Sequence, residues 1–183
     1  PNPLKNAYLG YQIKNEHVEK IIKKIDKKKY QIIKKNLNEK AVSMLMKNKV
    51  LARCVGRSEF GARALGNRSI IANPSNPEIK KIINEKIKNR DFWMPFAASV
   101  LDKYSKKYFE LNGNTENYKY MTSCVNTKTK YIEKLKAGLH PYDNTCRPQI
   151  VFKGDNSEYY NLIKKFGKKS NTYALLNTSF NLH

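Results

Sequence analysis

Three glycines spaced five residues apart interrupt the chain between two β-rich segments. Gly56, Gly61 and Gly66 stand in the stretch GRSEFGARALGNRSI, residues 56–70. Glycine tolerates positive φ angles and lets the backbone approach a ligand closely. The preceding segment, Val50–Val55, is β-rich and predicts a strand that carries this stretch as a loop at its tip. Ligand-binding loops often lie at such positions.

The same loop is rich in arginine, although the chain otherwise uses lysine. Lysine and arginine total 36. The only arginines are Arg53, Arg57, Arg63, Arg68, Arg90 and Arg147. A guanidinium grips a phosphate or carboxylate with two parallel hydrogen bonds, which an ammonium cannot do. We therefore predict an anion-binding loop; the alternative is that Glu59 pairs with one or two arginines, such as Arg57, inside an irregular connection.

Composition is that of one globular domain. The chain has 183 residues, 40% of them hydrophobic, which is enough to bury a core. Its net charge of +21 suits a nucleic-acid partner. However, lysine occurs together with asparagine and isoleucine throughout the sequence rather than in one basic patch, which favours a solvated surface. Aromatic side chains for base stacking cluster away from the arginines, at Tyr104, Tyr108, Phe109, Tyr118 and Tyr120. Nucleic acid is therefore not the expected partner.

Cysteine and histidine usage predicts a cytoplasmic protein without a bound transition metal. The three cysteines, Cys54, Cys124 and Cys146, form no close pair, as expected of reduced thiols. The three histidines lack metal-ligand spacing. No apolar run approaches the ~18 residues that span a bilayer, and the start lacks a hydrophobic signal segment, so no membrane association is expected.

Hydrophobic periodicity predicts four helices. Val18, Ile21, Ile22 and Ile25 follow helical spacing, and Asn76-Pro77-Glu78 is a helix start signal. The predicted helices are Glu16–Lys28, Leu37–Lys47, one from Asn76 to near Arg90, and one through Tyr159 and Phe166 that ends at Gly167.

The remaining β-rich segments complete an α/β fold. Besides Val50–Val55, the predicted strands are Arg68–Ala72, Phe96–Leu101, Tyr120–Val125, Gln149–Lys153 and Tyr173–Leu176. Strands and helices alternate irregularly, which predicts one domain, residues 1–183, with a mixed sheet and flanking helices.

Four ordered blocks resemble a known family. The first two are GRSEFGARALGNRSI and NPEIKKIINEKIKNRDFWMPFAASVL; the later two are HPYDNTCRPQIV and FGKKSNTYALLNTSFN. Together they resemble the C-terminal domain of the O-carbamoyltransferases, the family of the nodulation protein NodU and antibiotic-carbamoylating enzymes. The resemblance runs from about Tyr8 to His183, and four ordered blocks are more specific than a lone motif.

The resemblance implies a YrdC-like fold, an open twisted sheet with a concave basic face. Such a domain takes carbamoyl phosphate and ATP, with Mg²⁺, and makes carbamoyl-adenylate. A separate N-terminal metal-binding domain, absent from these 183 residues, then transfers the carbamoyl group to a hydroxyl. The family continues through Gly-Glu-Pro where this chain ends at Asn181-Leu182-His183, so the domain is expected to be truncated there.

The resemblance also implies roles for particular residues. Lys88, Arg63 and Arg147 match the family's catalytic positions, with Arg147 facing carbamoyl phosphate. The implied nucleotide-binding residues are Arg57, Arg68, Arg90, Asn177, Ser179 and Asn181. Lys88 and Arg90 form a K-x-R pair for phosphate groups, and the polar turn at the C-terminal end contacts the adenylate.

Three departures and three alternatives remain. Ala62 and Ala98 replace frequent prolines, and Met94 stands where an arginine commonly precedes Pro-Phe-Ala, which removes a phosphate contact. Asn177 has a second interpretation, as the cap of its own turn. A basic RNA-binding YrdC-like module is the alternative function, and an inactive or regulatory domain is a third.

Overall fold

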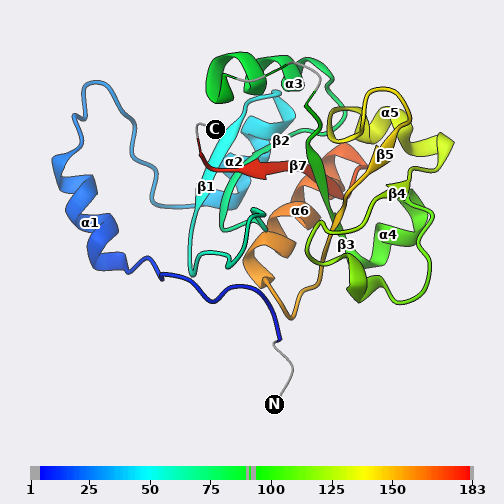
Figure 1. Cartoon of the computed structure of the whole chain (residues 1–183). Coiled ribbons are helices and arrows are strands. Elements are labelled where there is room, and N and C mark those ends of the chain that lie inside the picture. The colour runs from blue at the N-terminus through cyan, green and yellow to red at the C-terminus, as the bar shows by residue number, and fades with distance from the viewer. Residues whose placement is uncertain (1–4, 90, 92–93, 182–183) are drawn as a thin grey trace.

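The computed structural model describes residues 5–89, 91 and 94–181. Its centre is a five-stranded sheet (Figure 1). The strands are β1 (Leu51–Cys54), β2 (Arg68–Ala72), β3 (Ala97–Leu101), β6 (Gln149–Val151) and β7 (Ala174–Ser179). Their order is β1-β2-β7-β3-β6, and β3 and β6 are parallel while the other neighbours are antiparallel. The predicted α/β fold with a mixed sheet is confirmed; the YrdC-like likeness and the concave basic face stay predictions.

Helices and shorter elements precede and connect the strands of this sheet. The α-helices are α1 (Asn15–Lys24), α2 (Leu37–Met46), α3 (Glu78–Ile83), α4 (Asp102–Tyr108), α5 (Ile132–Leu135) and α6 (Ser157–Ser170). A π-helical turn, Asn84–Lys88, continues α3, and 3-10 turns cover Thr115–Tyr118, Thr129–Tyr131 and Lys136–Gly138. A separate antiparallel pair joins β4 (Val125–Asn126) to β5 (Thr145–Cys146).

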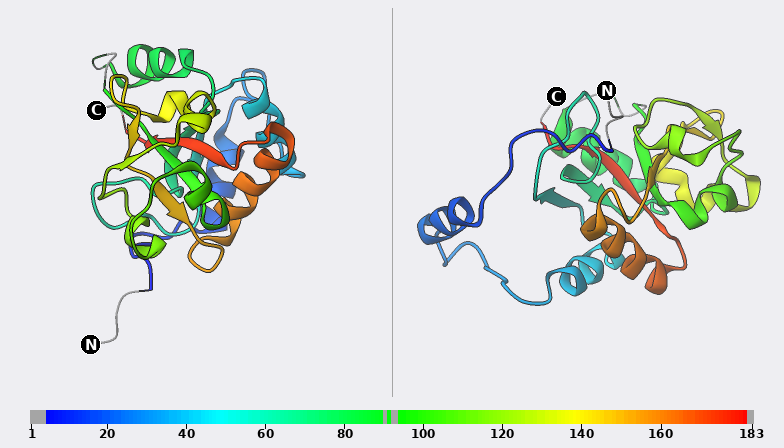
Figure 2. Two further views of the ribbon diagram at one scale, coloured as in Figure 1. Left: turned by 90° about the vertical axis from the view of Figure 1, so that its right-hand side faces the viewer. Right: turned by 90° about the horizontal axis from the view of Figure 1, so that it is seen from below.

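Alternation along the central strands buries both faces of the sheet. Ile71 of β2 and Leu175 of β7 belong to a core cluster shared with α2 and α6. Their neighbours Ile70 and Leu176 point the other way, into a cluster with Ile79 of α3. Successive side chains of a strand face opposite sides, so one apolar run serves two layers of helices. Figure 2 shows α2 and α6 on one side of the sheet and α3 on the other.

Helix α1 stands apart from this core. The structure confirms a helix in this segment, although it ends at Lys24 rather than at the predicted Lys28, and none of its residues is buried. Figures 1 and 2 show it beside the body on long connections from residues 5–14 and 25–36. The helical spacing therefore predicts the secondary structure here without predicting burial.

One predicted strand is wrong. Tyr120–Val125 contains a turn at Met121, whose φ is 56°, and only Val125 joins a strand. The segment is rich in β-formers, but strand propensity depends on a neighbouring strand to pair with. Met121 is buried, 5% exposed, but no strand pairs with it, so burial here does not produce a β-strand.

The predicted helix stop at Gly167 is also wrong. Helix α6 runs on to Ser170, and Asn171, with φ 55°, takes the left-handed position that ends it. Gly167 lies inside the helix because it packs against Tyr173: a Cβ there would stand 2.3 Å from that ring's Cδ1. Glycine in this helix is thus a packing requirement.

Gly167→Ala is therefore expected to destabilise the fold, although alanine normally favours a helix. The Tyr173 ring cannot easily yield, since it stacks on Tyr104 with centroids 3.8 Å apart. We expect a loss of about 1–3 kcal/mol in the free energy of unfolding, measured by urea denaturation. Gly154→Ala is the matched control, because nothing lies within 4 Å of its added Cβ. Equal stability of the two variants would contradict the packing argument.

Candidate active site

A cavity of about 110 Å³ lies where the arginine loop meets two central strands. Three segments form its wall, residues 62–64, 95–97 and 177–179, together with Met121 and Arg147. Segment 62–64 carries Arg63, and segment 177–179 is the end of β7. The fold thus brings Arg63 and Arg147 together with Asn177 and Ser179, four of the nine predicted site residues.

The arginine loop is held by one carboxylate. Glu59 Oε1 accepts backbone N–H groups from Leu65 at 2.7 Å, Asn67 at 2.7 Å and Arg68 at 3.1 Å. Arg57, the suggested partner of Glu59, instead donates to the carbonyl of Leu9 at 3.3 Å. A carboxylate that accepts several N–H groups fixes a loop much as a cap fixes a helix end. Glu59 therefore frames the loop from inside rather than pairing with an arginine.

Neighbouring side chains hold the loop's carbonyl groups. The Leu65 carbonyl accepts from Gln149 Nε2 at 2.7 Å and from the Tyr8 hydroxyl at 2.8 Å. Burial raises the pKa of Tyr8 to about 12, so its phenol stays a neutral donor. The Gly66 carbonyl accepts from Arg53 Nε at 2.7 Å. These bonds leave little freedom to the backbone that follows Arg63, at residues 65–68.

Gly66 is required by this framework. Its φ is 110°, and a Cβ at this position would stand 2.3 Å from Cδ1 of Tyr159 on α6. The positive φ confirms one property predicted for these glycines, while the close approach is to the Tyr159 ring, and an approach to a ligand stays a prediction.

Two of the predicted phosphate-binding arginines point into backbone. Arg68 donates to four carbonyls, those of Val55 at 2.6 Å, Asn67 at 2.9 Å, Gly56 at 3.1 Å and Tyr11 at 3.2 Å. Neither Arg57 nor Arg68 lines the cavity. Their geometry joins the loop to residues 9–11, and their role as nucleotide ligands stays a prediction.

Lys88 lies under the end of β7. It is 1% exposed, and its ammonium donates to Ser179 O at 2.8 Å, Ser179 Oγ at 3.1 Å, Asn181 Oδ1 at 2.8 Å and Asn181 O at 3.2 Å. The π-helical turn that carries Lys88 ends at Asn89, which is left-handed with φ 45°. Such turns are frequent at functional sites. Lys88, Ser179 and Asn181 therefore form one group, while Arg90 lies outside the described residues.

Asn177 belongs to a buried polar network under the cavity. Its Nδ2 lies 3.0 Å from the Ala64 carbonyl, 3.0 Å from Ser99 Oγ and 3.2 Å from Gln149 Oε1. The Ser99 hydroxyl donates to Gln149 Oε1 at 2.6 Å. These contacts cross the sheet, so Asn177 does not serve its own turn. Among the described residues its Oδ1 has no hydrogen-bond partner, although it is buried at the cavity.

Met121 is a site residue that sequence reasoning missed. It lines the cavity with a left-handed backbone, a costly conformation for a non-glycine residue and one that clusters at functional sites. Glu59 and Gln149 also hold the loop beside the cavity. For Glu59 the sequence offers a signal, because a carboxylate six to nine residues before the N–H groups of Leu65, Asn67 and Arg68 can accept from them. No pattern marks Met121, because its residue type does not favour positive φ.

A second turn precedes Arg147. Asp143 Oδ1 accepts from the Thr145 backbone at 2.9 Å and from its hydroxyl at 2.8 Å, and it contacts His140 Nδ1 at 3.1 Å. The Thr145 hydrogen bonds, together with His140, lower the pKa of Asp143. The turn leads into β5, and Arg147 follows β5 at the cavity.

Neither a cluster of metal-ligand side chains nor a membrane-spanning helix is found in the described part of the chain. No three His, Cys, Asp or Glu side chains gather there as a metal ion would require. Within the same residues, no helix has the length and apolar character to cross a membrane.

The mixed α/β domain places two arginines, Arg63 and Arg147, at a small polar cavity, and sequence comparison shows the family to which the domain belongs. The family model described as "Carbamoyltransferase C-terminus" matches residues 41–183. The chain belongs to this family.

Relatives extend the same conclusion. "Uncharacterized protein MJ1058" of Methanocaldococcus jannaschii is 39% identical over 183 residues, which cover 98% of this chain and 29% of the relative. "Nodulation protein NolO" of Bradyrhizobium diazoefficiens is 39% identical over 141 residues, 77% of this chain and 26% of the relative. "Nodulation protein U" of Rhizobium tropici is 31% identical over 141 residues, 77% and 24% respectively. The chain spans about a third or less of the length of these relatives.

Proposed function

We propose that this chain is the YrdC-like domain of a carbamoyltransferase, and that it forms carbamoyl-adenylate from carbamoyl phosphate and ATP. An N-terminal metal-binding domain of the longer protein would pass the carbamoyl group to a hydroxyl acceptor. The observation that carries the proposal is the cavity at which Arg63 and Arg147 meet the end of β7, with Lys88 beneath it. Family membership supports the carbamoyl chemistry.

The reaction brings many negative oxygens together. Hydrolysis of carbamoyl phosphate gives carbamate and inorganic phosphate. A carbamate oxygen then attacks the α-phosphorus of ATP, the bond from that phosphorus to the bridging oxygen breaks, and pyrophosphate leaves with the electron pair. Little covalent help from the protein is needed, so catalysis depends on positioning and on neutralising charge.

The residues at the cavity differ in how they would position the substrates and neutralise their charge. Arg63 and Arg147 offer planar forks for phosphate oxygens, and the loop framework around Glu59 keeps Arg63 in place. Lys88 holds Ser179 and Asn181 and places a positive charge under them. Asn177 lines the cavity and holds the Ala64 carbonyl, next to Arg63, through its Nδ2.

Magnesium would enter with the nucleotide. Mg²⁺ commonly takes its ligands from substrate phosphates and water with few protein groups. This matches a cavity whose charged lining residues are arginines.

We expect ATP with Mg²⁺ to bind the folded chain, and Arg63→Lys and Arg147→Lys each to weaken that binding about tenfold or more. The charge is kept in both variants, so the loss reports fork geometry. Isothermal calorimetry with ATP and a non-hydrolysable adenylate mimic measures it. Reversing Lys23, Lys24 and Lys27 to glutamate is the control and should leave ATP binding unchanged.

Binding of a short RNA by the same variants, measured at two salt concentrations, distinguishes the RNA-binding alternative from the proposed function. The RNA affinity of such a module follows its total charge. The triple lysine-to-glutamate variant would therefore bind RNA more weakly, while the two arginine-to-lysine variants would bind it as tightly as the wild type. That pattern, or no ATP binding by the folded wild-type chain, would refute the proposal. Carbamoylation of an alcohol by this chain alone would refute the division of labour with an N-terminal domain.

A further inference from the structure

The segment from residue 14 to 36, here called the arm, exposes an apolar helix face. It contains α1, in which Val18 is 40% and Ile21 61% exposed. Together with Ile22 they form one apolar stripe within the helix, which ends at Lys24. A ten-residue helix is marginal in water unless its apolar face is covered. The arm therefore has the composition of a segment that packs against something.

The apolar surface continues at the root of the arm. Leu9 is 44%, Tyr11 63% and Phe60 75% exposed. Leu9 and Phe60 also line a largely apolar cavity of about 530 Å³ beside Arg63. Exposed apolar surface on this scale marks an interaction site. This second group of exposed apolar side chains therefore lies at the edge of the candidate active site.

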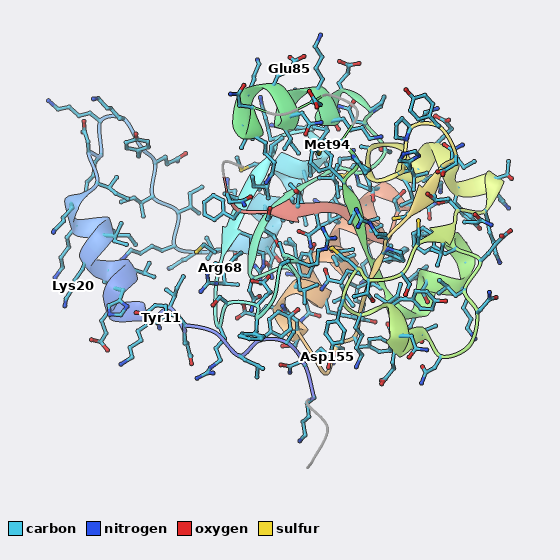
Figure 3. The ribbon with its side chains drawn as sticks, in the orientation of Figure 1. Tyr11, Lys20, Arg68, Glu85, Met94 and Asp155 are labelled. Atoms are coloured by element: carbon cyan, nitrogen blue, oxygen red, sulfur yellow. The ribbon has the colours of Figure 1, made fainter. Side chains whose placement is uncertain are left out.

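Charge defines the kind of surface that fits. The arm carries nine lysines and three acidic residues, a net charge of +6. Figure 3 shows Lys20 projecting from α1 away from the body. A complementary face has an apolar centre and an acidic rim.

We propose that the arm docks on the N-terminal portion of the same polypeptide, in a protein as long as the relatives. This rests on the proposed function, which assigns such a portion to the enzyme. The family's C-terminus model begins at residue 41, after the arm. The match to MJ1058 nevertheless covers 98% of this chain, arm included, within a relative of which it fills only 29%. A tether gives the preceding portion a high effective concentration, which favours it over a second copy or a separate protein.

Docking would reach the active site through the root of the arm. The Tyr11 carbonyl accepts from Arg68 Nη2 at 3.2 Å and from the Ser58 backbone at 2.9 Å. The Leu9 carbonyl accepts from Arg57 Nη1. Figure 3 shows Tyr11 at this root. Residues 9–11, which precede the arm, are thus bonded directly to the loop that carries Arg63.

Hydrogen exchange of the arm tests the proposal. The 183-residue chain is compared with a full-length fusion in which it replaces the matching region of MJ1058. We expect amides of the arm to exchange at least about tenfold more slowly in the fusion, because docking protects them. The double variant Val18→Asp/Ile21→Asp should restore fast exchange. Both residues are exposed in the isolated chain, so the variant keeps its fold.

Met44→Asp is the matched control, since Met44 is 44% exposed but lies on α2 outside the arm; it should leave the arm's protection intact. Equal exchange in the fusion and the isolated chain would overturn the proposal. So would a dimer of the isolated chain, seen by light scattering, that the double variant dissociates. If vesicles of anionic phospholipid slow amide exchange of the arm in the 183-residue chain, and the fusion alone does not, the arm binds a membrane instead and the proposal is wrong. ATP calorimetry on the same proteins keeps the two questions separate: a protected arm without ATP binding refutes only the proposed chemistry.

Discussion

Lys88→Met is expected to lower the rate of carbamoyl-adenylate formation at least about 100-fold. Removing one preorganised donor at a charged transition state typically costs that much. Lys88 also holds Ser179 and Asn181, so its loss disturbs the polar turn that the adenylate is proposed to contact. Pyrophosphate release from ATP and carbamoyl phosphate measures the rate.

Lys80→Met is the matched control for this loss. Lys80 lies earlier on the same helix, and its ammonium donates to a backbone carbonyl, that of Leu139, at 2.6 Å. Both substitutions remove the ammonium donor from part-buried backbone acceptors, at about 1–3 kcal/mol each, so both lower stability. Only Lys88→Met should lower the rate of the folded enzyme. Equal effects of the two variants on that rate would mean that Lys88 has a structural role alone.

Local patterns predicted most of the fold. Helix α2 and strand β2 lie where periodicity and β-propensity placed them, because each pairs with or packs on the core in the ordinary way. The start of α3 also follows its signal, since Asn76 Oδ1 accepts from the Glu78 backbone at 3.1 Å. Such signals are carried by a few adjacent residues, which is why one sequence suffices to find them.

The errors lie where distant contacts decide. Gly167 and Tyr173 meet only in the folded chain, so the local sequence alone predicts a helix stop at this glycine. The turn at Met121 depends on its packing at the cavity, which no local propensity encodes. Helix α1 has the right spacing but no covering layer among the described residues.

The site shows the same division. The glycine and arginine pattern predicted an anion-binding loop, and Arg63 and Arg147 do line one cavity. The sequence could not separate these two from Arg68, whose guanidinium bonds to four backbone carbonyls. Residue type is the same in all three; only the surrounding carbonyl groups differ, and those come from segments far apart in the chain.

Glu59→Ala is expected to combine a loss of stability with a loss of nucleotide binding. The substitution removes the acceptor of three backbone N–H groups, those of Leu65, Asn67 and Arg68. Hydrogen bonds to a charged group contribute about 1.5–3 kcal/mol each, and partial exposure of the site to water reduces their sum. We expect the free energy of unfolding to fall by about 2–4 kcal/mol in urea denaturation.

Nucleotide binding should fall because the same bonds position Arg63. A loop that has lost its frame no longer presents the fork of Arg63 at one place, and a displacement of about 1 Å is enough to cost 10-fold to 100-fold in such sites. Calorimetry with ATP, at a temperature where the variant remains folded, should show at least about tenfold weaker binding. Glu59→Gln keeps one acceptor oxygen without the charge and should fall between the alanine variant and the wild type.

Glu158→Gln separates this effect from a general loss of negative charge. Glu158 is an exposed partner of Arg53, with 3.4 Å between Oε2 and Nη2, and such surface pairs contribute about 0–1 kcal/mol. Its loss should leave both stability and ATP affinity nearly unchanged. If Glu59→Ala lowers stability while the folded variant binds ATP as tightly as the wild type, the loop holds Arg63 without the carboxylate, and Glu59 serves the fold alone.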